Sequence, residues 1–185
     1  GLNGGIGVDY TLSQRFAWYA GLDAATKRNQ DVHQFNLSSL DARFGPAWSG
    51  ERFQLRLGFN LGAMQLGDDD YRRHRGASVE WRYSLKADKQ IVAGVQHTRF
   101  RYRVGEARVF DTNQSVGLLG MSILVNEEKQ AVVLPYLVAG KEDDTGGNVQ
   151  GNKRITGGGV NARLALTPSR ALSFGVGAQR GAYDQ

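Results

Sequence analysis

The 185-residue sequence has no cysteine, only 3 prolines and only 3 histidines. The absence of cysteine excludes a disulfide framework and a thiolate metal site. His33, His74 and His97 do not follow a metal-ligand spacing, so we expect no metal and no cofactor. No run reaches the roughly 18 apolar residues that a membrane-spanning helix needs. A transmembrane β-barrel is still allowed, because its strands show lipid only with every second side chain.

The charge of the chain is weakly positive and dispersed. A net charge of +5 and a pI of about 9.6 permit an anionic partner, such as a lipid head group, an acidic sugar or a nucleic acid. The Lys and Arg residues do not form a run, however, and this argues against nucleic acid. We therefore expect no nucleic-acid partner.

The segment 53–63 carries the clearest pattern in the chain. Apolar side chains occupy every second position, and Gly or polar residues stand between them. Successive side chains of a strand point to opposite faces, so this pattern predicts a strand with one apolar face and one wet face. The segment has roughly the 9–11 residues that cross a bilayer, whereas strands of soluble sandwiches are nearer five or six. Many of the 25 glycines lie in such segments, where only close packing or strong curvature requires them.

Ten such segments follow one another without a helical period between them. We expect strands at residues 6–12, 16–24, 34–44, 53–63, 77–85, 91–102, 115–125, 132–138, 159–166 and 172–179. Short turns at 13–15, 45–50, 86–90, 126–130 and 167–170 alternate with longer loops at 26–33, 67–75, 105–113 and 141–152. Outer-membrane barrels alternate in this way, since their periplasmic turns are short and their outer loops long. The sequence predicts an all-β antiparallel up-and-down transmembrane β-barrel, with a soluble β-sandwich or barrel as the alternative.

Several positions qualify this prediction. Segment 115–125 is apolar on both faces, so the sequence does not assign its facing. Pro46 is expected in a turn, and Pro135 predicts a bulge or a locally broken pairing. Amphipathic aromatic rings favour the head-group zone of a membrane. The residues expected in such interfacial girdles are Tyr10, Trp18, Trp48, Trp81, Tyr83 and Tyr136.

We expect residues 1–185 to form a single barrel domain in the outer membrane of a Gram-negative bacterium. If the short turns are periplasmic, both ends of the chain lie outside the cell, whereas such barrels normally begin and end in the periplasm. The chain is therefore interpreted as an interior segment, incomplete at both ends, of a barrel of at least about twelve strands.

Charged residues recur on the strand faces that this barrel would turn inward. They are Asp9, Asp23, Asp41, Arg43, Arg56, Glu80, Arg82 and Arg163. One interpretation is a charged lumen that guides an anionic or polar cargo. The alternative is that a wide barrel holds water, and its acidic and basic side chains simply satisfy one another across strands.

A second set of charges lies in the predicted outer loop 67–75. It comprises Asp68, Asp69, Asp70, Arg72, Arg73 and Arg75. The three aspartates, like the 142–144 acidic cluster, offer oxygen ligands for Ca²⁺, but the fixed spacing of a calcium loop is absent. The arginines, with His74, are candidates for the phosphates of lipopolysaccharide. Ordinary solvated loop charge is the alternative for both groups.

The sequence does not predict an enzyme. Nucleophilic hydrolysis needs a Ser, a His and an acid that converge, and nothing beyond the neighbourhood of His97, Thr98 and Ser78 suggests one. The glycine clusters at 4–5 and 157–159 are not followed by a helix, so they are not phosphate loops. We expect no catalytic residue, and a barrel-embedded lipid-modifying enzyme is kept as the second alternative function.

Residues 44–50 (Phe-Gly-Pro-Ala-Trp-Ser-Gly), the strand at 53–63 and the segment 70–85 together resemble the membrane barrel of the surface lipoprotein assembly modifiers. That resemblance implies a barrel of about fourteen strands joined to a periplasmic helical-repeat domain, which helps lipoproteins reach the cell surface. We therefore expect a barrel that assists export or surface display of a lipoprotein or similar macromolecule. Its expected partners are outer-membrane lipid, lipopolysaccharide and a lipoprotein cargo. A passive or polysaccharide-exporting porin is the first alternative to this function.

Overall fold

The computed structural model describes residues 2–28, 36–67, 69–126, 128, 130–148, 151–167 and 170–183. These residues form ten strands and one short 3₁₀ helix. The elements are β1 (Leu2–Thr11), β2 (Phe16–Lys27), β3 (Leu37–Ser49), β4 (Phe53–Leu66), β5 (Asp69–Lys86), β6 (Lys89–Tyr102), η2 (Glu106–Phe110), β7 (Thr112–Asn126), β8 (Ala131–Asp144), β9 (Lys153–Thr167) and β10 (Arg170–Tyr183).

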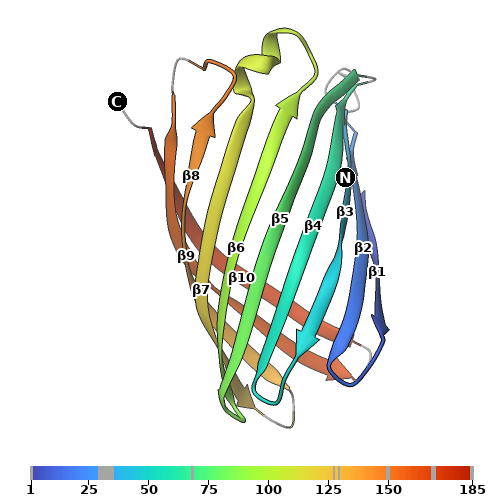
Figure 1. Cartoon of the computed structure of the whole chain (residues 1–185), viewed down its shortest axis with the longest axis vertical. Coiled ribbons are helices and arrows are strands. Elements are labelled where there is room, and N and C mark those ends of the chain that lie inside the picture. The colour runs from blue at the N-terminus through green and yellow to red at the C-terminus, as the bar shows by residue number, and fades with distance from the viewer. Residues whose placement is uncertain are drawn as a thin grey trace.

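The ten strands form one antiparallel sheet in the order of the chain, from β1 to β10. Each strand pairs with the next, as in an up-and-down meander. The sheet curls so strongly that β9 and β10 pass behind β5 to β7 (Figure 1). The prediction of an all-β antiparallel up-and-down barrel of ten visible strands is therefore confirmed.

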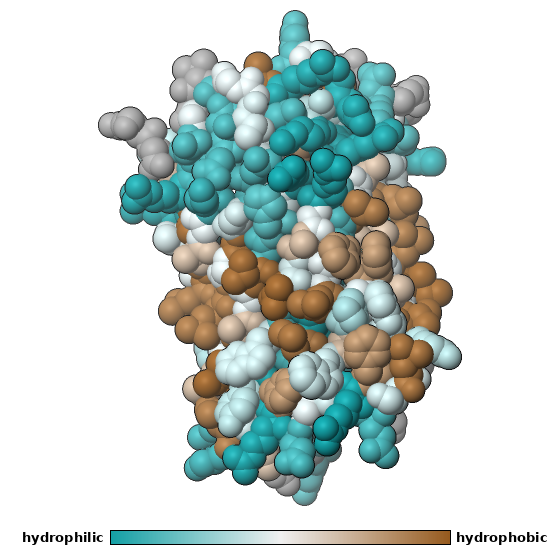
Figure 2. Space-filling model, viewed as in Figure 1, coloured by the Kyte–Doolittle hydropathy of each residue, from teal (hydrophilic) through white to brown (hydrophobic). Residues whose placement is uncertain are grey.

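The two faces of the sheet differ in the way that the sequence predicts. Large apolar side chains are exposed on the convex face, for example Leu57, Phe59 and Leu61 on β4. Within the described residues, the buried apolar side chains are only Ala47, Val92 and Ile155. A soluble sandwich would bury its apolar rows between two sheets. Here they form a belt across the middle of the visible outer face, between hydrophilic ends (Figure 2). The soluble alternative is therefore wrong.

No helix in the described part of the chain is long and apolar enough to cross a bilayer.

The strands are longer than predicted, and the largest error lies in β5. This strand begins at Asp69, so the predicted outer loop 67–75 is mostly strand, paired with β4 on one side and β6 on the other. Only residues 67–68 connect β4 to β5, and Gly67 adopts a φ of 63° there. Apolar alternation stops where the apolar belt stops, whereas backbone pairing continues beyond it. The predicted loop at 141–152 shortens to 145–152 for the same reason. The predicted loop at 105–113 keeps its length but lies at 103–111, and η2 folds within it.

The predicted turn at 45–50 is also corrected, because β3 continues through Gly45 and Pro46 to Ser49. The pairing of β3 with β4 skips these two residues, which lie opposite Leu57 and Gly58. Proline has no N–H to donate to the ladder. The Leu57 carbonyl accepts a hydrogen bond from the Tyr19 hydroxyl of β2 instead, at 3.1 Å. A side chain that reaches across β3 thus replaces a backbone hydrogen bond.

This replacement predicts the effect of a Tyr19→Phe variant. Loss of the hydroxyl leaves the Leu57 carbonyl without its donor, which costs about 1–2 kcal/mol of unfolding free energy. Urea unfolding of the barrel in lipid vesicles measures the change. Tyr10→Phe is the matched control, because Tyr10 is 65% exposed on β1. An equal loss of stability in both variants would contradict the role given to the Tyr19 hydroxyl.

The structure settles the facing of the β7 strand, which the sequence left open. Leu119 and Met121 are exposed on the convex face, whereas Val116 and Leu118 line the concave face. The pairing of β7 with β8 runs to Gly120–Tyr136 and resumes at Ile123–Val133. The interruption lies opposite Pro135, so the expected local break in pairing is confirmed.

Aromatic rings gather on the convex face near the short turns. The contacting pairs are Phe16–Trp18, Trp48–Phe53 and Trp81–Tyr83. Such a girdle marks a membrane interface. Tyr136 was expected in a girdle too, but it points inward, where its hydroxyl lies over Gly159 and Gly177. Its parity, shared with the inward Val138, decides this, since neighbours two apart on a strand face the same way.

Candidate functional site

Seven charged or titratable side chains of β2 to β5 meet on the concave face. We call them the inner-wall charge cluster: Asp23, Asp41, Arg43, Arg56, His74, Glu80 and Arg82. Six of them line one cavity of about 750 Å³. All except His74 were predicted as lumen-facing from their alternation with apolar residues.

Strand register explains how the cluster is assembled. Asp41 of β3 pairs with Gly62 of β4, and Gly62 pairs with His74 of β5. Gly62 carries no side chain, so the Asp41 carboxylate and the His74 ring approach one another over it, with Oδ1 and Nε2 3.1 Å apart. A Cβ at position 62 would overlap both groups. Glycine here permits a polar contact between strands that are not neighbours.

Two other ion pairs complete the cluster. Arg43 and Asp23 lie 3.0 Å apart, with side chains 64% and 50% exposed. Arg82 and Glu80 lie 2.8 Å apart on the same strand. Ion pairs this exposed contribute about 0–1 kcal/mol each. Their main effect is therefore on the electrostatic potential along the inner wall, and they contribute little to the stability of the fold.

Arg56 differs from the other members. Its register partner is Glu80, but the Glu80 carboxylate bonds Arg82 instead. Its guanidinium lies over the Tyr19 ring, 5.5 Å from the centroid. Its Nε is buried and, among the described residues, has no hydrogen-bond partner. Among the described residues, Arg56 is therefore the member of the cluster held by a ring contact rather than by an ion pair or a hydrogen bond.

The opposite side of the same cavity is mostly apolar, with Gln96 of β6 as its polar side chain. Val92 of β6, Val116 and Leu118 of β7, and Val138 of β8 line it. The inner wall thus has a charged half, from β2 to β5, and an apolar half, from β6 to β8. The inner wall continues from β8 onto β9 and β10. The register places small or polar residues at the inward positions there, among them Gly157, Gly159, Asn161, Gly175 and Gly177.

Two predicted lumen residues lie apart from the cluster. Asp9 is on β1, opposite Tyr19, and is exposed. Arg163 is on β9, opposite Val132 of β8, and is exposed as well. Both have the inward parity that the sequence assigned, but neither lines the cavity of the cluster.

The predicted outer-loop candidates divide between the two faces of β5. Asp68 lies outside the described residues. Arg72 points inward, with its guanidinium 5.0 Å from the Phe100 ring centroid. Arg73 and Arg75 point outward, and Arg73 pairs with Asp70 at 2.6 Å. Asp69 begins the strand opposite Leu66. These residues belong to a strand rather than a loop, as the correction of β5 requires.

The described part of the chain contains no group of His, Asp and Glu that would hold a metal ion. The acidic side chains of the 142–144 cluster have other partners. Glu142 accepts from Gln114 at 3.0 Å, Asp143 pairs with Lys141 at 2.9 Å, and Asp144 accepts from the Gly146 N–H at 3.0 Å. These contacts favour the interpretation of ordinary charge over a calcium site.

His97 does not meet Ser78, since the two residues lie on opposite faces of the sheet. Its Nδ1 lies 2.9 Å from the Ser115 hydroxyl, on the convex face. Within the described residues, no carboxylate contacts His97 to orient and charge it. The pair lacks the third group of a hydrolytic triad.

Comparison with known proteins adds one decisive observation. The β domain of the Bordetella autotransporter Brka superposes with a TM-score of 0.56 at 20% identity, over 98% of this chain and 83% of that one. The fold is that of an outer-membrane β-barrel. The siderophore receptor PirA from Pseudomonas aeruginosa also matches, with a TM-score of 0.47 and 12% identity, but the chain spans only 35% of the receptor's length. No protein-family model matches the sequence, and no curated protein does.

Sequence reasoning missed the apolar half of the inner wall. The signal was present, because segment 115–125 is apolar on both faces, and only one face of a barrel strand meets lipid. Arg99 and Arg101 were missed for another reason. The register of β6 against β5 shows that both point outward. The sequence does not show this, because the last residues of β6 are polar or charged on both faces and do not alternate with apolar ones.

Proposed function

We propose that this outer-membrane barrel assists export or surface display of a lipoprotein or similar macromolecule. The observation that carries the proposal is the division of the inner wall into a charged half and an apolar half. A pore for small ions needs polar groups and uses apolar ones chiefly at a narrow gate, so a broad apolar wall is not what ion conduction requires. An extended polypeptide, or a polypeptide with an acyl chain, presents both kinds of surface at once.

The energetics of the two halves suit a cargo that passes through. Covering 100 Å² of apolar wall contributes about 2.5 kcal/mol at roughly 25 cal/mol per Å². This corresponds to a dissociation constant far weaker than micromolar, so the cargo is held briefly and then released. The charged half supplies hydrogen bonds to backbone carbonyls. One protein of the same fold is named an autotransporter, so the fold is compatible with secretion.

Photo-crosslinking tests the proposal at two adjacent residues of β7. Leu118 points inward, and Leu119, 57% exposed, points toward lipid. The barrel is produced in its own bacterium with p-benzoylphenylalanine at one position or the other, and lipoproteins are labelled with an alkyne fatty acid. We expect an adduct of protein size that carries the fatty-acid label from position 118, and none from position 119.

A porin is the alternative that the inner-wall charge cluster favours. It predicts no protein adduct from position 118, together with a steady single-channel conductance whose ion preference changes in Arg56→Glu. That pair of results would replace the export proposal. A labelled adduct at position 118 and an unchanged ion preference would dismiss the porin.

A further inference from the structure

The convex face carries an unexplained concentration of positive charge. Six arginines line one groove of about 860 Å³, which we call the arginine groove: Arg73 and Arg75 of β5, Arg99 and Arg101 of β6, Arg103 beyond its end, and Arg108 of η2. Asp111 is the one carboxylate among the lining residues described. The groove does not belong to the inner wall, and export does not require it.

The arrangement of four of these arginines is costly for the fold. Arg73 pairs directly with Arg101, and Arg75 pairs directly with Arg99. Like charges in directly opposite positions of neighbouring strands destabilise a sheet. The four guanidinium groups therefore lie close together, at two successive outward positions on each of the two neighbouring strands. Such a patch requires an anionic partner to neutralise it.

The protein itself neutralises only part of the patch. Asp70 pairs with Arg73 at 2.6 Å, and Asp111 lies 3.8 Å from Arg101. Arg75 and Arg99 are exposed and make no ion pair within the described part of the chain. These two guanidinium groups form the row of the groove nearest the apolar belt, and they are available to an external ligand.

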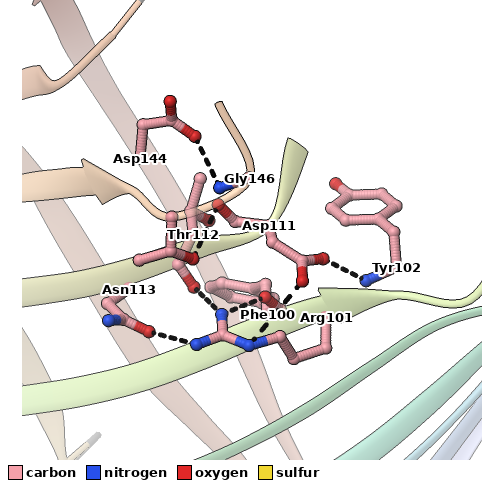
Figure 3. Close-up of polar contacts among 9 residues, drawn as sticks. Phe100, Arg101, Tyr102, Asp111, Thr112, Asn113, Asp144 and Gly146 are labelled. Atoms are coloured by element: carbon pink, nitrogen blue, oxygen red, sulfur yellow. Dashed lines mark hydrogen bonds and ion pairs between the residues drawn. The ribbon is translucent and has the colours of Figure 1, made fainter. Parts of the chain in front are cut away.

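One wall of the groove is held rigidly (Figure 3). Arg101 donates to the carbonyls of Phe100 and Thr112, at 2.8 and 3.1 Å, and to the Asn113 side chain at 3.1 Å. Asp111 accepts from the Tyr102 N–H at 2.7 Å. The segment that contains η2 is thereby fixed against the end of β6, so the groove is formed before a ligand arrives.

The floor of the groove is apolar. Leu40 and Ala42 of β3, with Leu61 and Ala63 of β4, line it. Leu61 pairs with Arg75, and Ala63 pairs with Arg73, so the aliphatic side chains of β3 and β4 lie directly beside the guanidinium groups of β5 and β6. The groove therefore lies where the apolar belt gives way to the hydrophilic upper zone of Figure 2. This is the long-loop end of the barrel, which faces the cell exterior in outer-membrane barrels.

We propose that the arginine groove binds lipopolysaccharide of the outer leaflet through its phosphate groups. The phosphates of the lipid A head group contact Arg75 and Arg99, and the acyl chains lie along Leu40 and Leu61. Arginine suits this ligand because its planar guanidinium binds phosphate in a bidentate manner. The sequence pointed to lipopolysaccharide only through the 72–75 segment. In the structure Arg72 points inward and is not part of the arginine groove, whereas Arg99 of β6 is.

Binding is measured on the purified chain in detergent, with bisphosphorylated lipid A as the probe and native mass spectrometry as the readout. We expect Arg75→Glu/Arg99→Glu to weaken binding about thirtyfold, since each arginine near an anionic lipid surface contributes about a fourfold to sixfold effect. Arg15→Glu/Arg52→Glu changes the net charge equally in turns at the opposite end, and it should bind as the unmodified chain does. Equal binding by the two double variants would overturn the proposal.

Two further measurements separate lipid recognition from simple anion binding. Lipid A without phosphates should bind as weakly to the unmodified chain as bisphosphorylated lipid A binds to the variant. Inorganic phosphate at the same concentration should not compete; if it displaced lipid A fully, the groove would be an anion site only. Heat-dependent gel mobility shows whether Arg75→Glu/Arg99→Glu is folded. If it is not, Arg75→Gln/Arg99→Gln replaces it, with the same expected direction.

Discussion

A Gly45→Val variant is expected not to fold into the barrel. Gly45 lies in β3 where the ladder to β4 is interrupted, and a Cβ at this position would overlap the Leu57 carbonyl oxygen and approach the Leu57 carbonyl carbon to 2.9 Å. The obstacle is backbone rather than the end of a flexible side chain, so it cannot move without breaking the Tyr19–Leu57 hydrogen bond. We expect a loss of more than about 3 kcal/mol. The measurement is refolding yield into lipid vesicles, followed by heat-dependent gel mobility.

Gly4→Val is the matched control. Gly4 lies within β1, and nothing approaches a Cβ at this position within 4 Å. The two variants share the loss of glycine flexibility and the gain of a β-branched side chain. Only the steric overlap differs. A Gly45→Val barrel that refolds as well as the Gly4→Val barrel would show that β3 and β4 separate more easily here than the structure implies.

The fold was predictable because its strongest signal is local. The outward and inward sets of β4 follow from the alternation around Leu57 alone, whatever the rest of the chain does. The limits of the strands were less predictable, since β5 is paired from Asp69 although its first residues are charged on both faces. Hydrophobic periodicity reports where lipid is, and it does not report where backbone pairing ends. The prediction of a turn at Pro46 was wrong for a related reason. The hydroxyl that replaces the missing N–H of Pro46 comes from Tyr19, which is far away in the sequence.

The candidate sites depend on register, which the sequence does not provide. Alternation assigned Asp41 and Arg56 to the inner face, but it did not reveal that Asp41 meets His74 over Gly62. Likewise, the outward arginines of β5 were visible as a cluster in the sequence. Their direct opposition to Arg99 and Arg101 appears only once β5 and β6 are paired. Contacts across strands are therefore the part of the site that required the structure.

Leu119→Arg is expected to lower the free energy of unfolding of the barrel in lipid much more than Leu118→Arg does. Leu119 lies in the middle of the outward apolar run of β7, beside Ala93 and Leu137 in register. A charged side chain on the lipid face near the bilayer centre costs about 2–4 kcal/mol. Leu118 faces the inner cavity, where water and the inner-wall charge cluster solvate a guanidinium, so Leu118→Arg should cost less than about 1 kcal/mol.

The comparison tests the orientation of the whole sheet, because one residue of register separates the two variants. Urea unfolding of each variant in lipid vesicles provides the free energies. If Leu118→Arg were the more destabilising variant, the concave face would be the one that meets hydrocarbon. The assignment of the inner-wall charge cluster to a water-filled lumen would then be wrong. If both variants kept the stability of the unmodified chain in detergent-free buffer, the apolar belt would not be in contact with lipid at all. The expected asymmetry connects the alternation seen in the sequence to the membrane, and every functional proposal made for either face depends on it.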